Sequence, residues 1–310
     1  MLISLFCITF CQANVRVSLN ESWMFSRSDS MGNYGQWQKV DIPHTWNAED
    51  TDDETPGYFR DKCMYKKSVV IPASKSKERV FLYFEGANQE TTLWVNGRQV
   101  GNHRGGYAGF GFDITDCVKF GKANLLEIVV TNAYDKTIAP LSADFTFYGG
   151  IYRDVWLSYL PQVHFSTRYY GSSGIVVTTP HKDGNFKQVD VLCRLQNHEK
   201  KAKMVTVKST LVDAEGKAVA SVSKKMKMAV GEADQVCRLS IPVTKPHLWS
   251  DVDPYLYKVN TEIVDNATRQ VCDENQATVG FRWYSFDPQK GFFLNGKHVK
   301  LIGTSRHQDF

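Results

Sequence analysis

The sequence predicts an all-β protein that begins with two consecutive β-sandwich domains. No long stretch shows the 3.6-residue period of an amphipathic helix. Short segments with period-two alternation recur instead, separated by Gly, Asn, Asp and Pro. The chain has 310 residues, roughly twice a typical domain, and its 42% hydrophobic content is sufficient for conventional cores.

The N-terminus carries a short apolar run, Met1 to Phe10, followed by Cys11-Gln12-Ala13. The run is too short to span a bilayer as a helix, and small residues occupy the two positions that a signal peptidase inspects. We therefore expect residues 1–13 to form an export signal and the protein to be periplasmic or secreted. No Lys or Arg precedes the run, so an incidental apolar N-terminus is the alternative. Bulky Phe10 argues against a lipid anchor on Cys11.

The first predicted domain follows this segment. Its clearest hairpin turn is Asn96-Gly97, a dipeptide that tolerates positive φ at both central positions. The expected strands around it are 80–85, 91–95, 98–101, 125–130 and 151–159. Many short strands joined by regular turns indicate a sandwich or barrel.

The character of the sequence changes near Leu160-Pro161, after which Lys, Val and Thr increase and Trp becomes rarer. Alternating apolar residues predict strands around 189–195, 205–211, 236–243 and 255–264, with a turn at Glu215-Gly216. About seven strands in about 120 residues fit an immunoglobulin-like sandwich. The Cys-Trp-Cys spacing of antibody domains is absent. A further hairpin at 291–300 opens a third unit.

Charge and cysteine content exclude some classes of site. The net charge is +4, and the densest basic stretch is 223–227. Without a nucleic-acid-binding motif, solvated strand faces explain it better, and we expect no nucleic-acid partner. Seven cysteines lie at 7, 11, 63, 117, 193, 237 and 272, with no C-x-x-C pair. Zinc is therefore not expected, and buried free thiols on strands are the preferred interpretation.

Several segments, in order along the chain, resemble glycoside hydrolase family 2, which includes β-galactosidases and β-glucuronidases. The resemblance runs from about residue 14 onward. Its motifs are Ile42-Pro43-His44-Thr45-Trp46-Asn47, Phe84-Glu85-Gly86-Ala87, Trp94-Val95-Asn96-Gly97, His103-Arg104-Gly105-Gly106-Tyr107, the stretch from Asp144 to Leu157, Pro246-His247-Leu248-Trp249-Ser250, Pro254-Tyr255-Leu256-Tyr257, Gly280-Phe281-Arg282, Leu294-Asn295-Gly296-Lys297 and the stretch from Gly303 to Asp309.

The resemblance implies the domain order. Residues 14–160 would form a jelly-roll sugar-binding domain, residues 161–283 an immunoglobulin-like sandwich, and residues 284–310 the first hairpin and strand of a truncated (β/α)₈ barrel. Such enzymes cleave terminal β-linked sugars with retention, using two carboxylates about 5–5.5 Å apart. Both are glutamates on later barrel strands, which the resemblance places beyond Phe310. We expect this chain to be inactive alone.

Asp144 is the principal candidate site residue. The matching aspartate of the family reaches from the first domain into the sugar pocket. A carboxylate accepts directional hydrogen bonds from sugar hydroxyls, and it can share them with a bound cation. The alternative is a turn aspartate that satisfies backbone amides before Gly149-Gly150.

His307 is the second candidate, because it matches a histidine that hydrogen-bonds a sugar hydroxyl at the end of the first barrel strand. The C-terminal ends of barrel strands are where such sites lie. Arg306 and Asp309 rank below it, as an ion pair that could aim the imidazole. The alternative for His307 is a structural histidine.

Other conspicuous residues are interpreted structurally. His44 and Trp46 are expected to pack and to fix loops, and Arg153 and Asp154 to sit mid-strand as ion partners. The tryptophans at 23, 94 and 156 alternate along strands, so core burial is expected rather than a sugar-stacking platform.

The predicted function is the N-terminal part of a retaining exo-β-glycosidase that acts on a terminal β-linked sugar, with β-galactoside favoured by overall likeness. The alternative is a stand-alone carbohydrate-binding protein; an adhesin-like tandem leaves the Arg306-His307 segment unexplained. No cofactor is required. Whether the full-length enzyme binds a monovalent or divalent cation stays open, with Asp144 as the candidate ligand. Whether it forms a homo-oligomer stays open as well. No membrane span is expected.

Overall fold

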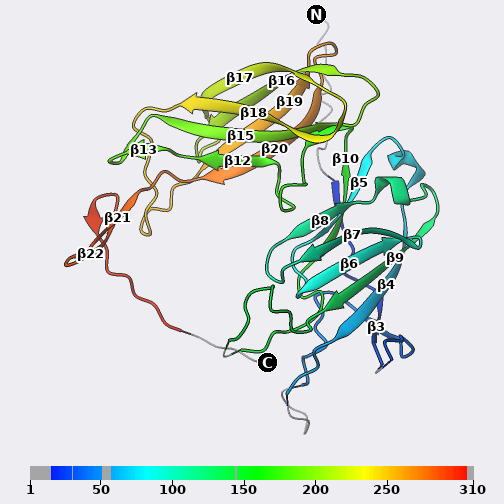
Figure 1. Cartoon of the computed structure of the whole chain (residues 1–310). Coiled ribbons are helices and arrows are strands. Elements are labelled where there is room, and N and C mark those ends of the chain that lie inside the picture. Colours follow the sequence, from blue (N-terminus) through cyan, green and yellow to red (C-terminus); the bar gives the residue numbers. More distant parts are fainter. Residues whose placement is uncertain (1–14, 30, 51–56, 144, 306–310) are drawn as a thin grey trace, which may run out of the picture. The chain divides into compact units, whose positions relative to one another are not determined.

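The computed structural model describes residues 15–29, 31–50, 57–143 and 145–305 (Figure 1). The chain divides into two compact units. One contains residues 16–159 together with 167–173, and the other contains 160–166 and 174–300. No helix among the described residues is long and apolar enough to cross a membrane.

The first unit is a sandwich of two sheets. The six-stranded sheet has the order β3-β2-β4-β9-β6-β7, and the four-stranded sheet the order β1-β10-β5-β8 (Figure 1). Their strands are β1 (Val15–Ser18), β2 (Trp23–Arg27), β3 (Gln38–Val40), β4 (Lys62–Val70), β5 (Arg79–Phe84), β6 (Glu90–Val95), β7 (Arg98–Arg104), β8 (Phe110–Asp113), β9 (Ala123–Thr131) and β10 (Val155–Leu160). Two short 3₁₀ turns, η1 (Ala73–Lys75) and η2 (Thr115–Cys117), lie between strands.

A single apolar core joins the two sheets of the first unit. Inward-facing residues of both sheets belong to it, including Trp23 and Tyr65 from one sheet and Leu82 and Leu157 from the other. The hairpin between β6 and β7 turns at Asn96 and Gly97, with φ values of 53° and 80°. Positive φ at both positions is what the Asn-Gly dipeptide predicts.

The second unit is also a two-sheet sandwich. In one sheet, β15 pairs on one edge with β11 and then β12, and on its other edge with β18; the other sheet has the order β17-β16-β19-β20. The strands are β11 (Val163–Phe165), β12 (Ile175–Thr178), β15 (Gln188–Asn197), β16 (Lys203–Val212), β17 (Ala218–Met228), β18 (Gly231–Pro242), β19 (Tyr257–Asp265) and β20 (Val271–Val279), with a small hairpin of β13 (His181–Lys182) and β14 (Asn185–Phe186).

The alternation in this region is confirmed. Val189, Val191, Cys193 and Leu195 are all buried along β15, as are the alternate residues of β16 from Val205 to Leu211. Cys63, Cys193 and Cys237 are buried on strands as expected, whereas Cys117 and Cys272 are only half-buried and Cys117 lies in the turn η2 rather than on a strand. The all-β fold class is therefore confirmed.

A three-stranded sheet of β21 (Tyr284–Asp287), β22 (Gly291–Leu294) and β23 (Lys297–His298) follows the second sandwich. Its hairpin turns at Asn295-Gly296, again with positive φ at both residues. That it opens a barrel stays a prediction.

Two expectations in the first unit are wrong. Arg153 and Asp154 precede β10, which begins at Val155, rather than lying mid-strand. Asp154 accepts a hydrogen bond from the Asn20 side chain at 2.9 Å, and the Arg153 guanidinium lies over the Tyr152 ring. The reason is that Gly150, with φ of +125°, and its neighbours form an irregular segment that delays the strand.

Core burial of the tryptophans is confirmed for Trp23 and wrong for Trp94 and Trp156, which are half-buried. Trp94 follows Leu93 and precedes Val95, both fully buried, so its own side chain points to the opposite face of β6. The Trp156 indole donates a hydrogen bond to Glu85 at the sheet surface.

Candidate functional site

The candidate site residues Asp144, Arg306, His307 and Asp309 lie outside the described residues, so their roles stay predictions. The structure does describe the frame that holds the loop on which Asp144 lies. This loop, residues 132–154, joins β9 to β10. The frame is built from the motif segments around Asn47, Asn88 and Gly149.

Asn132 anchors the start of the loop, directly after β9. Its fully buried side-chain amide lies 3.1–3.2 Å from three acceptors, which are the carbonyls of Phe59 and Phe147 and the Asn47 side-chain oxygen. A buried amide that loses such partners costs about 1–3 kcal/mol for each unsatisfied group. The contact with Phe147 therefore ties the two sides of the loop together near its base.

Gly149 anchors the returning side of the loop. Its backbone N–H donates to the Asn47 side-chain oxygen at 2.7 Å. A Cβ placed on Gly149 would lie 2.0 Å from the Trp46 ring and 2.8 Å from Asn132, so only glycine fits. The Pro-His-Thr-Trp-Asn motif and the Gly-Gly motif are thus packed directly against each other.

Asn88 provides a third anchor. Its side-chain amide donates to the Tyr148 carbonyl at 2.8 Å, and its backbone N–H donates to the Gly150 carbonyl at 3.0 Å. Gly106 packs against the same asparagine, where a Cβ would lie 2.1 Å from the Asn88 side-chain oxygen. The Tyr152 hydroxyl donates to the Gly106 carbonyl. The His103–Tyr107 motif is thereby joined to the frame.

His44 and Trp46 pack and fix loops, as expected. The His44 Nδ1 atom is 2.7 Å from the Tyr65 hydroxyl, and its backbone N–H bonds the Ile151 carbonyl. Burial, with a smaller contribution from the Arg27 charge, lowers the pKa of His44 to about 4. The imidazole is therefore neutral near pH 7 and serves as a hydrogen-bonding spacer.

Aromatic side chains surround the loop. The Arg60 guanidinium lies over the rings of Tyr58 and Phe147 and donates to the Asn132 carbonyl. Phe145, next to Asp144 in the sequence, is largely exposed and contacts Phe147 edge-on at 5.4 Å between ring centroids. The loop is thus held at its base by hydrogen bonds and ring contacts, while the side chain of Phe145 is exposed.

Sequence reasoning missed Asn88 and Asn132 as frame residues. Each is a single polar residue next to a predicted strand, and neither the alternation nor a motif distinguishes it. The only available signal was position, since Asn88 follows Phe84-Glu85-Gly86-Ala87 directly. Among the residues that the structure describes, no group of three or more His, Cys, Asp or Glu side chains could hold a metal ion.

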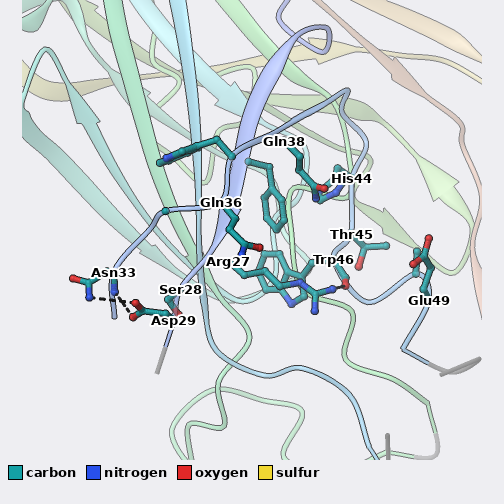
Figure 2. Close-up of a pocket in the computed structure, with 14 residues that line it drawn as sticks. Arg27, Ser28, Asp29, Asn33, Gln36, Gln38, His44, Thr45, Trp46 and Glu49 are labelled. Carbon is teal, nitrogen blue, oxygen red and sulfur yellow. Dashed lines mark hydrogen bonds between the residues drawn. The ribbon is translucent and has the colours of Figure 1, made fainter. Parts of the chain in front are cut away.

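A surface cleft of about 970 Å³ lies beside this frame, and Trp46 belongs to both (Figure 2). Its lining comes from the end of β2, the segment 33–38 and the segment 44–49. Figure 2 shows Gln36 and Arg27 at its centre, with His44, Thr45 and Glu49 on one side and Asp29 and Asn33 on the other.

Two family models match the chain. One, described as "Glycosyl hydrolases family 2, sugar binding domain", matches residues 9–161, and the other, described as "Glycosyl hydrolases family 2", matches residues 174–282. The first covers every segment of the loop frame.

Curated relatives and solved structures agree with these matches. A beta-glucuronidase from Bacteroides fragilis is 35% identical, and the match covers 98% of this chain and 43% of that protein. A beta-galactosidase from Bacteroides ovatus is 29% identical, and the match covers 95% of this chain and 34% of that protein. A crystal structure of a Bacteroides uniformis beta-glucuronidase superposes with a TM-score of 0.88 at 33% identity, covering 96% of this chain and 36% of that one. The chain therefore spans about a third to two fifths of the length of these relatives.

Proposed function

The chain belongs to glycoside hydrolase family 2, and on that premise we propose that it is the N-terminal part of a retaining exo-β-glycosidase that hydrolyses a terminal β-linked sugar. In this proposal the chain supplies scaffold and accessory substrate contacts. The acid and the nucleophile are the two glutamates expected on later barrel strands. Export to the periplasm or medium is part of the same proposal.

The observation that carries the proposal is the frame of the Asp144 loop. Three buried asparagines from separate segments, Asn47, Asn88 and Asn132, hold its base through directional hydrogen bonds. Such rigid support is what a residue needs if it must reach a substrate with a fixed geometry. A turn aspartate that only satisfied its own backbone would not require it.

The identity of the sugar has two candidates. Overall likeness of the sequence favours a β-galactoside. A β-glucuronide is supported by a different observation, because beta-glucuronidases give matches of 33–35% identity, although another matches at 28% and a "putative beta-galactosidase" from Bacteroides fragilis matches at 31%. Of the two we place the β-glucuronide first.

The test compares two proteins. The 310-residue chain and the product of the full coding sequence that contains it are incubated with p-nitrophenyl β-glucuronide and β-galactoside, and the anomer released first is identified by NMR. We expect no turnover by the chain alone and retention by the longer protein. Turnover by the chain that a substitution within it abolishes, or inversion by the longer protein, would refute the proposal. A reading frame that stops at Phe310 would favour a carbohydrate-binding protein instead.

A further inference from the structure

The cleft beside the loop frame has the composition of a binding site, and no role has been assigned to it. Its floor is aromatic. The rings of Phe25 and Trp46 stack with centroids 6.1 Å apart, and the centroid of the His44 ring lies 4.6 Å from that of Phe25. Phe25 and Trp46 are buried, and the lowered pKa of His44 leaves its ring uncharged near pH 7. The floor is therefore fixed in position and apolar.

Trp37 adds a less buried aromatic surface to the lining. Its ring is half-buried and receives the Lys66 ammonium 4.8 Å from its centroid. Lys66 is in turn paired with Glu127 at 3.0 Å on β9, so the contact is held from the sheet. Because Lys66 covers one face of the indole, it is the opposite face that would pack against the C–H face of a pyranose.

Unengaged polar groups complete the lining. The exposed side chains of Gln36, Gln38 and Glu49 make no hydrogen bond with any residue in the described part of the chain. A primary amide both donates and accepts, and so does a sugar hydroxyl, so two amides next to a carboxylate match a row of hydroxyls. The cleft thus combines an aromatic floor with many polar groups, in a volume at the upper end of the range of about 300–1,000 Å³ that is usual for small-molecule sites.

The charges in the lining favour a neutral ligand. Arg27 is engaged by the Trp46 carbonyl and by Asp50 at 3.7 Å, and its guanidinium lies over the Phe59 ring. Asp29 and Glu49 contribute negative charge. An acidic sugar would meet two carboxylates and an arginine that already has its partners, which is unfavourable.

We propose that this cleft is a second carbohydrate site that binds a neutral oligosaccharide, with Trp37 packing against a sugar ring and Gln36 and Gln38 bonding its hydroxyls. The site lies on the first sandwich and contains neither Asp144 nor any barrel residue. It therefore does not rest on the proposed hydrolysis.

Isothermal titration calorimetry of the 310-residue chain tests the proposal with cellohexaose, xylohexaose and β-1,4-galactotetraose, and with hexagalacturonate as the acidic counterpart. We expect at least one neutral oligosaccharide to bind more tightly than hexagalacturonate. Trp37→Ala and Gln38→Ala should each weaken that binding about tenfold or more. Tyr134→Ala, which removes an exposed aromatic of the same sandwich outside the cleft, should leave it unchanged.

Melting curves establish whether each variant is folded. If Trp37→Ala does not fold, Gln38→Ala still tests the proposal, because it changes only an exposed side chain. The proposal is overturned if none of the three neutral oligosaccharides binds, if hexagalacturonate binds more tightly, or if the folded cleft variants bind as the wild type does. Weakening by Tyr134→Ala instead would locate the binding on the Asp144 loop and also overturn it. Inactivity of the longer protein would leave these results unaffected.

Discussion

Gly149→Ala is the sharpest test of the frame that holds the Asp144 loop. The added methyl would lie 2.0 and 2.3 Å from two atoms of the Trp46 indole and 2.8 Å from Asn132. None of these side-chain atoms can move away at low energetic cost. Trp46 is buried against Phe25, and the two N–H groups of the Asn132 amide are shared among three acceptors at 3.1–3.2 Å. The backbone must shift instead, which lengthens the 2.7 Å bond from Gly149 to Asn47.

Overpacking of this kind typically costs about 1–3 kcal/mol. Weakening a buried hydrogen bond adds about 1 kcal/mol. For a domain of this size, each kcal/mol lowers the melting temperature by about 2–4 °C. We therefore expect the transition of the first sandwich to fall by roughly 4–15 °C.

Differential scanning calorimetry is the appropriate assay, because the two sandwiches can unfold in separate transitions. Gly35→Ala is the matched control, since a Cβ there meets nothing within 4 Å and its φ is not positive. Only the first-sandwich transition should move in Gly149→Ala, and neither should move in Gly35→Ala. A Gly149→Ala protein that melts within about 1 °C of the wild type would refute the packing described for the frame.

Three further predictions follow from the sequence and the structure. In the longer protein, Asp144→Ala should lower kcat/KM about tenfold to more than a hundredfold with little change in Tm, and normal kinetics in a folded variant would end the functional interpretation. Burial raises the pKa of Asp273 to about 7. The folded protein therefore favours the neutral form of Asp273, and its contribution to the unfolding free energy of the second sandwich is complete below about pH 4. This contribution, at most about 4 kcal/mol, is lost as the pH rises through 7. Asp273→Asn should flatten the pH dependence of the unfolding free energy over that range, and equal slopes in both proteins would contradict the assignment. Limited proteolysis should trim residues 287–310 before either sandwich, because Leu301 and Ile302 are 67% and 88% exposed; simultaneous cleavage of the sandwiches would contradict this.

Local patterns were sufficient for most of the strands. Alternation predicted the buried face of β15 and β16, and the Asn-Gly dipeptides predicted two hairpin turns with positive φ. The buried face of a strand depends on residues two positions apart, and the turn depends on the conformational preference of one dipeptide. Both can therefore be read from the local sequence. The family resemblance also rested on short contiguous motifs, which the two family models match.

Alternation could not predict which face of a strand lies inward at every position. Trp94 and Trp156 alternate as Trp23 does, but only Trp23 lies in the core. The difference depends on which sheet covers each face, and that is settled by strand pairing over long distances. A large apolar side chain is therefore a weaker guide than the register of its whole strand.

The frame of the candidate site depends on the tertiary structure still more strongly. Asn47 and Asn132 are 85 residues apart in sequence, and Asn88 bonds the carbonyl of Tyr148, 60 residues away. Each asparagine alone is indistinguishable from a surface turn residue. It becomes a structural anchor only when the folded sheets bury it, because burial removes water and leaves the protein carbonyls as its partners. The motifs thus indicated the family and the position of Asp144 in the sequence, whereas the support for its loop emerged only from the packed sandwich.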